Sequence, residues 1–135
     1  MVCAPDRIND DLPLLLFLQG GPGGESPRPL SPTSDGWIEE AVKHFRVVLP
    51  DQRGTGRSSC VDGRTIKALG ERATAAGSDA ARSQADFLKR HLASSIVRDF
   101  EYLRLVGFGG KPWVTLGQSY GGFLTLSYLS LFPEA

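Results

Sequence analysis

The sequence predicts an α/β fold in which about three parallel strands form a core with helices on both faces. Short apolar runs alternate along the chain with segments of helical periodicity, and this alternation favours parallel strands joined by crossover helices. The first and third apolar runs end at glycine-containing turns, as expected where buried strands end at one edge of a sheet. We therefore treat residues 1–135 as one domain around a single core.

Three strands are predicted. The first is Leu14–Leu18, a continuous apolar run that precedes a glycine-rich turn, which is typical of a strand buried on both faces. The second covers residues 46–49, where β-branched valines are followed by Pro50. The third covers residues 113–116.

Helical spacing of apolar residues predicts the segments between the strands. A helix over about 36–45 has Ser34 or Asp35 as its N-cap. Residues 60–80 are polar and irregular, with a short helix at about 65–74. A long helix at about 81–105 and a last helix at 121–132 complete the order. The long helix would place five apolar residues on one face: Leu88, Leu92, Ile96, Phe100 and Leu103.

Charge and cysteine content exclude several classes of protein. Fifteen basic and 15 acidic residues give zero net charge, which offers no electrostatic attraction for nucleic acid or an anionic membrane. The two cysteines, Cys3 and Cys60, have no ligand-like spacing, so we expect no metal, no cofactor and no disulfide framework. The first apolar run is too short to span a bilayer and follows acidic residues, so a cytoplasmic protein is the default expectation.

The strongest chemical signal is the pattern G-Q-S-Y-G from Gly117 to Gly121, between a predicted strand and a predicted helix. In that context the pattern predicts a nucleophile elbow, in which Ser119 occupies a sharp turn that exposes its hydroxyl. Gly117 and Gly121 are required because side chains there would collide with neighbouring backbone. The alternative is a chance glycine–serine turn, which the flanking strand and helix disfavour.

The glycine-rich turn after the first strand reads Q-G-G-P-G-G from Gln19 to Gly24. In an acyl-transfer enzyme a backbone N–H of Gly20 or Gly21 would form an oxyanion hole together with the N–H of Tyr120. A plain loop or a phosphate cradle is the alternative, but neither phosphate-binding glycine pattern occurs here.

A third motif, D-Q-R-G-T-G-R-S from Asp51 to Ser58, follows the second strand. Its charged groups could act in catalysis, but the simpler interpretation is a tight structural loop held by hydrogen bonds of Asp51 and Arg53.

Together these motifs resemble the proline iminopeptidase (prolyl aminopeptidase) branch of the α/β-hydrolases, over nearly the whole chain. The resemblance rests on G-G-P-G after the first strand, the D-Q-R-G-x-G-x-S loop, S-I-V-R-D at 95–99, and the G-Q-S-Y-G-G elbow. It implies a serine peptidase that releases N-terminal proline, with Ser119 as nucleophile and Gly20, Gly21 and Tyr120 at the oxyanion hole. Gln19 departs from the histidine of the narrower family pattern, which affects the subfamily rather than the mechanism.

A serine hydroxyl needs a histidine base oriented by an acid, and in α/β-hydrolases both follow the serine in the chain. After Ser119 the sequence holds one carboxylate, Glu134, and no histidine, whereas His44 and His91 precede it. We therefore expect a partial α/β-hydrolase fold without the family's cap domain and C-terminal strands, with exposed strand edges and little turnover on its own.

Alternatives remain open at this stage. One is an esterase or other acyl hydrolase with the same elbow, acting on a small acyl substrate instead of a peptide. Another is a non-catalytic fragment or interaction domain. A nucleotide-binding or oxidoreductase function is poorly supported by the glycine patterns. Substrate preference, oligomeric state and the identity of the acid and histidine are not predicted by these residues.

Overall fold

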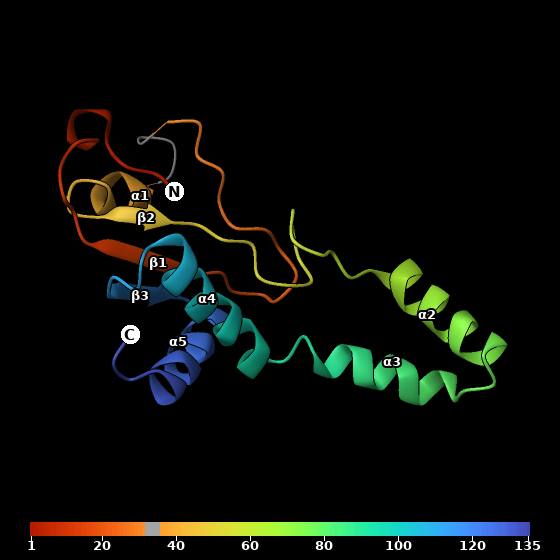
Figure 1. The fold of residues 1–135 in the computed structure, drawn as a ribbon. Helices are drawn as coiled ribbons and strands as arrows, with labels where there is room; N and C mark the ends of the chain where they lie inside the picture. The colour runs from red at the N-terminus through yellow and green to blue at the C-terminus, as the bar shows by residue number, and fades with distance from the viewer. Residues whose placement is uncertain (32–35) are drawn as a thin grey trace.

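Three parallel strands form the sheet, in the order β2–β1–β3 (Figure 1). The structure is a computed structural model that describes residues 1–31 and 36–135. The strands are β1 (Leu14–Leu18), β2 (Arg46–Val48) and β3 (Trp113–Gly117), and Leu14 of β1 is in register with Arg46 and Trp113. The parallel sheet of three strands predicted from the apolar runs is confirmed.

The central strand β1 is buried on both faces, which explains its continuous run of apolar residues. Leu14, Leu16 and Leu18 belong to one hydrophobic cluster, whereas Leu15 belongs to another on the opposite face. The edge strand β3 alternates instead, with Trp113 buried and Val114 exposed.

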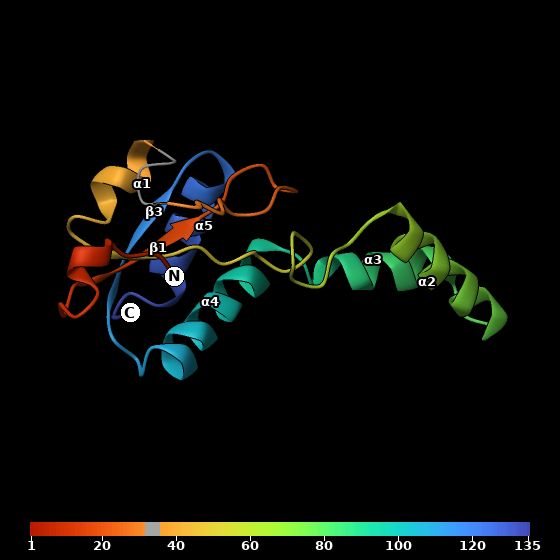
Figure 2. The same ribbon diagram turned by 90° about the horizontal axis from the view of Figure 1, so that it is seen from above.

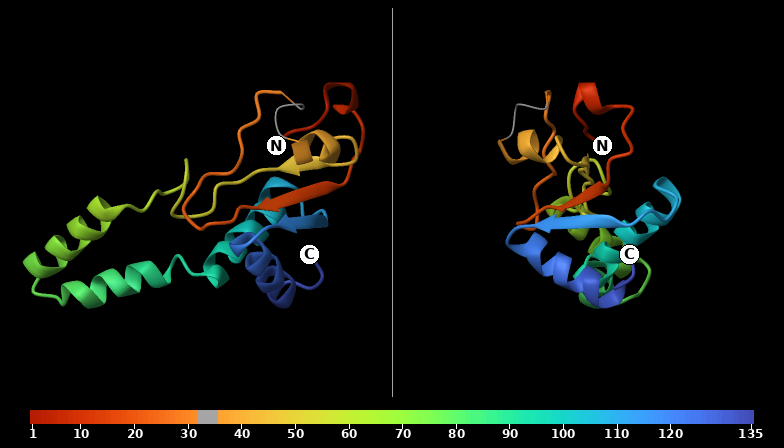
Figure 3. Two further views of the ribbon diagram at one scale, coloured as in Figure 1. Left: turned by 180° about the vertical axis from the view of Figure 1, so that it is seen from behind. Right: turned by 90° about the vertical axis from the view of Figure 1, so that its left-hand side faces the viewer.

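Helices cover both faces of the sheet, as predicted (Figure 3). Helix α1 (Gly36–Ala41) packs on the Leu15 face through the buried side chain of Ile38. On the other face, α4 (Ala93–Gly107) and α5 (Tyr120–Leu131) pack against β1 and β3. The chain continues as a turn beyond Ala41, so α1 is shorter than the predicted 36–45. The predicted N-caps Ser34 and Asp35 lie outside the described residues.

The single long helix predicted over 81–105 is wrong, because two helices occupy this region. Helix α3 (Ala80–Lys89) ends before a turn, and α4 begins after Leu92, whose ψ of 160° is extended. The carbonyl of Arg90 in the turn accepts a hydrogen bond from the Arg53 guanidinium at 2.6 Å. This interaction with a distant loop stabilises the break, and a helical periodicity cannot reveal it.

The break also changes which residues form the core. Ile96 and Phe100 are buried on α4, but Leu88 and Leu92 are 46% and 57% exposed. The predicted apolar face is therefore correct only for the α4 half.

Helices α2 (Gly63–Ala75) and α3 form a hairpin that projects away from the sheet (Figures 1 and 2). Each helix has an aspartate N-cap: Asp62 accepts from the Thr65 N–H at 2.8 Å, and Asp79 accepts from the Arg82 N–H at 3.1 Å. Within the described residues these two helices pack against each other and against no other helix or strand.

The edges of the sheet differ. Val2 forms an antiparallel bridge with Val47 on the outer side of β2, whereas no strand of the described chain pairs with the outer side of β3. Apolar side chains are also exposed on β3 and α5: Val114, Leu116, Phe123, Leu126, Leu129 and Leu131. The expectation of an exposed strand edge is thus met on one side.

A buried polar network joins α4, β3 and α5. The Tyr128 hydroxyl donates to Glu101 Oε2 at 2.6 Å and accepts from Trp113 Nε1 at 3.1 Å. Arg104 pairs with both carboxylate oxygens of Glu101, at 2.9 and 2.8 Å. Burial raises the pKa of Tyr128, and hydrogen bonding to Arg104 lowers the pKa of Glu101, so the phenol stays protonated and the carboxylate stays ionised.

Replacing Tyr128 with phenylalanine should therefore lower the free energy of unfolding. The Trp113 indole N–H would lose its acceptor and Glu101 would lose a donor, and each lost partner of a buried group costs about 1–3 kcal/mol. Chemical denaturation of the full-length protein measures the effect, with Tyr102→Phe as control because Tyr102 is 68% exposed. Equal stability of the two variants would contradict the network's role.

Candidate active site

Ser119 lies in the turn between β3 and α5, with φ 56° and ψ −123°. Among the described residues it is the one non-glycine with positive φ, a conformation that is costly for a residue with a Cβ atom. Its side chain is exposed. Backbone strain at an exposed serine between strand and helix is the geometry that the elbow pattern predicts.

Close backbone contacts explain the glycines around Ser119. A Cβ atom added at Gly121 would lie well under 3.0 Å from the carbonyl oxygen of Leu18 at the end of β1. A Cβ atom at Gly117 would meet the Gly121 carbonyl oxygen just as closely. The start of α5 therefore packs directly on the central strand, and only glycine fits there.

The glycine-rich loop after β1 lies against the elbow. A Cβ atom at Gly20 would be 2.7 Å from the Gln118 carbonyl oxygen and 3.5 Å from Ser119 Cβ. None of the hydrogen bonds among the described residues uses the backbone N–H of Gly20, Gly21 or Tyr120 as donor. The first loop thus lies beside Ser119, and the amide donors expected at an oxyanion hole have no partner among the described residues.

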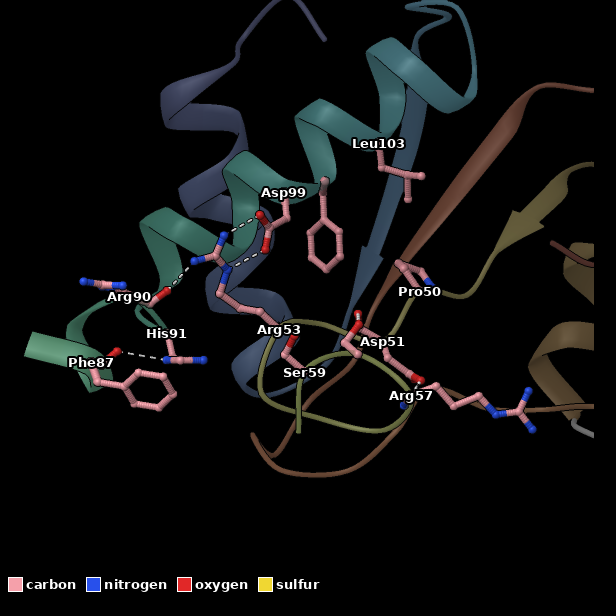
Figure 4. Close-up of a pocket in the computed structure, with 12 residues that line it drawn as sticks. Pro50, Asp51, Arg53, Arg57, Ser59, Phe87, Arg90, His91, Asp99 and Leu103 are labelled. Atoms are coloured by element: carbon pink, nitrogen blue, oxygen red, sulfur yellow. Dashed lines mark hydrogen bonds and ion pairs between the residues drawn. The ribbon is translucent and has the colours of Figure 1, made fainter. Parts of the chain in front are cut away.

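The loop after β2 is fixed by Asp51 and Arg53, which have separate partners. The Asp51 carboxylate is buried, with 3% of its side chain exposed, and bonds to the backbone of Ser26 and Arg57 and to Arg28. Arg53 makes a bidentate ion pair with Asp99 of α4 (Figure 4). This pairing with Asp99 raises the pKa of Arg53 and binds the loop to the helix.

Neither histidine makes a hydrogen bond to Ser119. His44 lies in the turn before β2, at the N-terminal ends of the strands. Because the strands are parallel, Ser119 lies at the opposite, C-terminal ends. His91 lies nearer, lining a cavity of about 190 Å³ with Gly23 and Tyr120. Its Nδ1 is 3.1 Å from the Phe87 carbonyl oxygen, and the imidazole of His91 contacts the phenyl ring of Phe87 (Figure 4).

Two polar residues near the site were given no individual role in the predictions from the sequence. Ser26 is 1% exposed and donates its hydroxyl to the Pro50 carbonyl at 2.6 Å. The Gln52 amide is buried without a hydrogen-bond partner in the described chain, beside the cavity that Tyr120 lines. The motif that contains Gln52 does not reveal that its amide is buried, and the hydrogen bonds of Ser26 to Pro50 and Asp51 span 24 and 25 residues of sequence.

Residues 1–31 and 36–135 contain no group of three or more His, Cys, Asp or Glu side chains arranged to hold a metal ion. No helix in these same ranges has the length and apolar character needed to cross a bilayer.

The fold and the elbow define an α/β hydrolase: a family model described as the alpha/beta hydrolase fold matches residues 13–135, and the chain belongs to this family. Within the family the chain is similar to proline iminopeptidases, which confirms the branch that its motifs predicted. It is 46% identical to the proline iminopeptidase of Aeromonas sobria over 99% of its own length. Identity is 37% with proline iminopeptidase aneH of Aspergillus aculeatus and 31% with the proline iminopeptidase of Neisseria gonorrhoeae, over 98% and 93% of the chain.

These relatives are much longer than the chain. The matched region covers 29%, 28% and 31% of their respective lengths. The chain thus spans less than a third of each of these curated relatives.

Proposed function

We propose that Ser119 is the nucleophile of a serine hydrolase of the proline iminopeptidase type, which releases N-terminal proline from peptides through an acyl-enzyme. The observation that carries the proposal is the strained, exposed Ser119 between β3 and α5, with Gly20 of the glycine-rich loop packed beside it. The names of the relatives support the same reaction.

In this reaction the Ser119 oxygen attacks the carbonyl carbon of the substrate's first residue. The hydroxyl proton passes to a base, and the carbonyl oxygen becomes an oxyanion that accepts from the N–H of Tyr120 and of Gly20 or Gly21. The carbon–nitrogen bond then breaks, and the leaving amine takes the proton. Water hydrolyses the resulting ester, which frees proline and restores the Ser119 hydroxyl.

We place the base and its acid outside residues 1–135. The Ser119 hydroxyl has no hydrogen-bond partner among the described residues, and both histidines have other contacts. The 135 residues alone should therefore show little or no turnover, because an unassisted serine is a weak nucleophile.

His91 is the one histidine near the elbow, so its replacement tests this placement of the base. We expect His91→Gln in the full-length protein to keep kcat within about fivefold of the wild type, because the base lies elsewhere in this proposal. Loss of a general base would instead lower kcat by about 10²–10⁴-fold. Steady-state hydrolysis of a prolyl arylamide measures kcat. A loss approaching that of Ser119→Ala would make His91 the base and contradict the placement.

The class of substrate is tested by comparing a prolyl arylamide with short-chain aryl esters on the full-length protein. A higher kcat/KM for the prolyl arylamide than for arylamides of other amino acids would support the peptidase. Efficient hydrolysis of the esters without cleavage of any aminoacyl arylamide would favour an esterase with the same elbow. No cleavage of either type would favour a non-catalytic role.

A further inference from the structure

Ser26, two residues beyond the glycine-rich loop, anchors the far end of that loop to the segment that follows β2. The Ser26 N–H donates to Asp51 Oδ1 at 2.9 Å, and the Ser26 hydroxyl donates to the Pro50 carbonyl at 2.6 Å. Ser26 is 1% exposed, so both bonds are protected from water. The other end of the loop is continuous with β1.

Between these ends, the loop has little internal support. The hydrogen bonds found among the described residues involve none of the backbone groups of 20–24. Residues 21–24 are exposed, and among the loop's glycines Gly20 is the one at which an added Cβ atom would meet the elbow. The position of the Gly20 and Gly21 N–H groups therefore depends on how the two ends are held.

Asp51 holds the far end as an ionised, buried carboxylate. Its Oδ2 accepts from the Arg57 N–H at 2.8 Å and from the Arg28 guanidinium, while Oδ1 serves Ser26. Burial raises the pKa of Asp51, but the hydrogen bonds from the backbone of Arg57 and Ser26 and from Arg28 outweigh it, and the pKa is lowered overall. The carboxylate thus joins two loops at the edge where Ser119 emerges.

We propose that Asp51 is a positioning residue of the oxyanion hole. Its bond to Ser26 sets the end of the glycine-rich loop and thereby places the Gly20 and Gly21 N–H groups opposite Ser119. The inference rests on the proposed function, since it assumes that an oxyanion forms at Ser119. Both carboxylate oxygens already accept from loop donors, so Asp51 acts through the loop rather than on the substrate.

The expected effect appears in the transition state rather than in substrate binding. Oxyanion donors work only within about 2.7–3.1 Å of the developing charge, and a displacement of about 1 Å can cost about 10²-fold in rate. Ground-state binding does not need this geometry. Loss of the Asp51 anchor should thus lower kcat and leave KM nearly unchanged.

The test uses Asp51→Asn in the full-length protein, with Asp99→Asn as matched control. Asparagine keeps the size of the side chain but removes the charge and one acceptor oxygen. Asp99→Asn removes a carboxylate from the same loop's other anchor, the ion pair with Arg53. The hydrogen bonds of Arg53 in the described chain go to Asp99 and Arg90 and not to the glycine-rich loop. Arg28→Ala, which weakens the Asp51 anchor from a half-exposed partner, serves if Asp51→Asn fails to fold.

Four quantities are measured: kcat and KM for a prolyl arylamide, affinity for the aldehyde analogue of proline, and affinity for pyrrolidine. The aldehyde forms a tetrahedral adduct with the Ser119 oxygen and places its own oxygen at the oxyanion hole, whereas pyrrolidine has the ring amine but no oxygen there. For Asp51→Asn we expect kcat and aldehyde affinity to fall by about 10- to 100-fold, with KM and pyrrolidine affinity within about threefold. Arg28→Ala should show a smaller loss with the same pattern, and Asp99→Asn should stay within about threefold throughout.

Equal losses of aldehyde and pyrrolidine affinity would overturn the proposal, as would unchanged aldehyde affinity or an equal effect of Asp99→Asn. Failure of the proposed function is visible separately, because the wild-type protein would then neither cleave the arylamide nor bind the aldehyde through Ser119.

Discussion

Replacing Ser119 with alanine in the full-length protein should lower kcat for a prolyl arylamide by about 10⁴-fold or more, because the acyl-accepting oxygen is removed. Oxyanion donors and substrate contacts remain in the variant, so a small residual rate over the uncatalysed reaction is expected. Affinity for proline should change little, since the hydroxyl takes part in bond formation rather than in ground-state binding.

Stability separates this loss from misfolding. The Ser119 side chain is exposed and makes no hydrogen bond among the described residues, so Ser119→Ala should unfold at nearly the wild-type denaturant midpoint. Hydrolysis that persists at more than about a tenth of the wild-type kcat would show that another group is the nucleophile.

Replacing Gly121 with alanine should be the most destabilising single change at the site. The added Cβ atom would lie well under 3.0 Å from the Leu18 carbonyl oxygen, which belongs to the central strand and cannot move alone. Either α5 or β1 must shift, and we expect a loss of about 3–5 kcal/mol in the free energy of unfolding. Such a loss is a large part of the stability of an ordinary domain, so poor yield of folded protein is expected as well.

Gly122 provides the matched control. It is the next residue of the same helix, and a Cβ atom there would meet its nearest neighbour, the Gly117 carbonyl oxygen, at an ordinary 3.7 Å. Gly122→Ala should be neutral or slightly stabilising, because alanine favours helix over glycine. Equal stability of Gly121→Ala and Gly122→Ala in chemical denaturation would contradict the close contact between α5 and β1.

Much of the fold follows from local patterns. The apolar run Leu14–Leu18 is long enough to mark a buried strand, and glycines at its end mark the loop that meets the elbow. The strand, the G-x-S-x-G turn and the helix around Ser119 could be predicted together because the turn imposes a steric requirement that only glycine meets.

Features that depend on distant contacts could not be predicted in this way. The break between α3 and α4 is stabilised by Arg53, which lies 37 residues before the carbonyl that it binds. The anchoring of Ser26 by Asp51 joins segments 25 residues apart, and nothing in the local sequence around Ser26 indicates it. Helical periodicity also continues through Leu92, although the chain there is extended and its side chain exposed.

The central claim is that Ser119 becomes an activated nucleophile in the whole protein. The most direct test is to label the full-length protein with a fluorophosphonate, digest it and locate the modified residue by mass spectrometry, with Ser119→Ala as control. We predict a single adduct on the peptide that contains Ser119 and no adduct in the variant. Prolyl arylamide hydrolysis should be lost in proportion to the extent of labelling. Unchanged labelling of Ser119→Ala, or an adduct on a different serine of an active protein, would contradict the account.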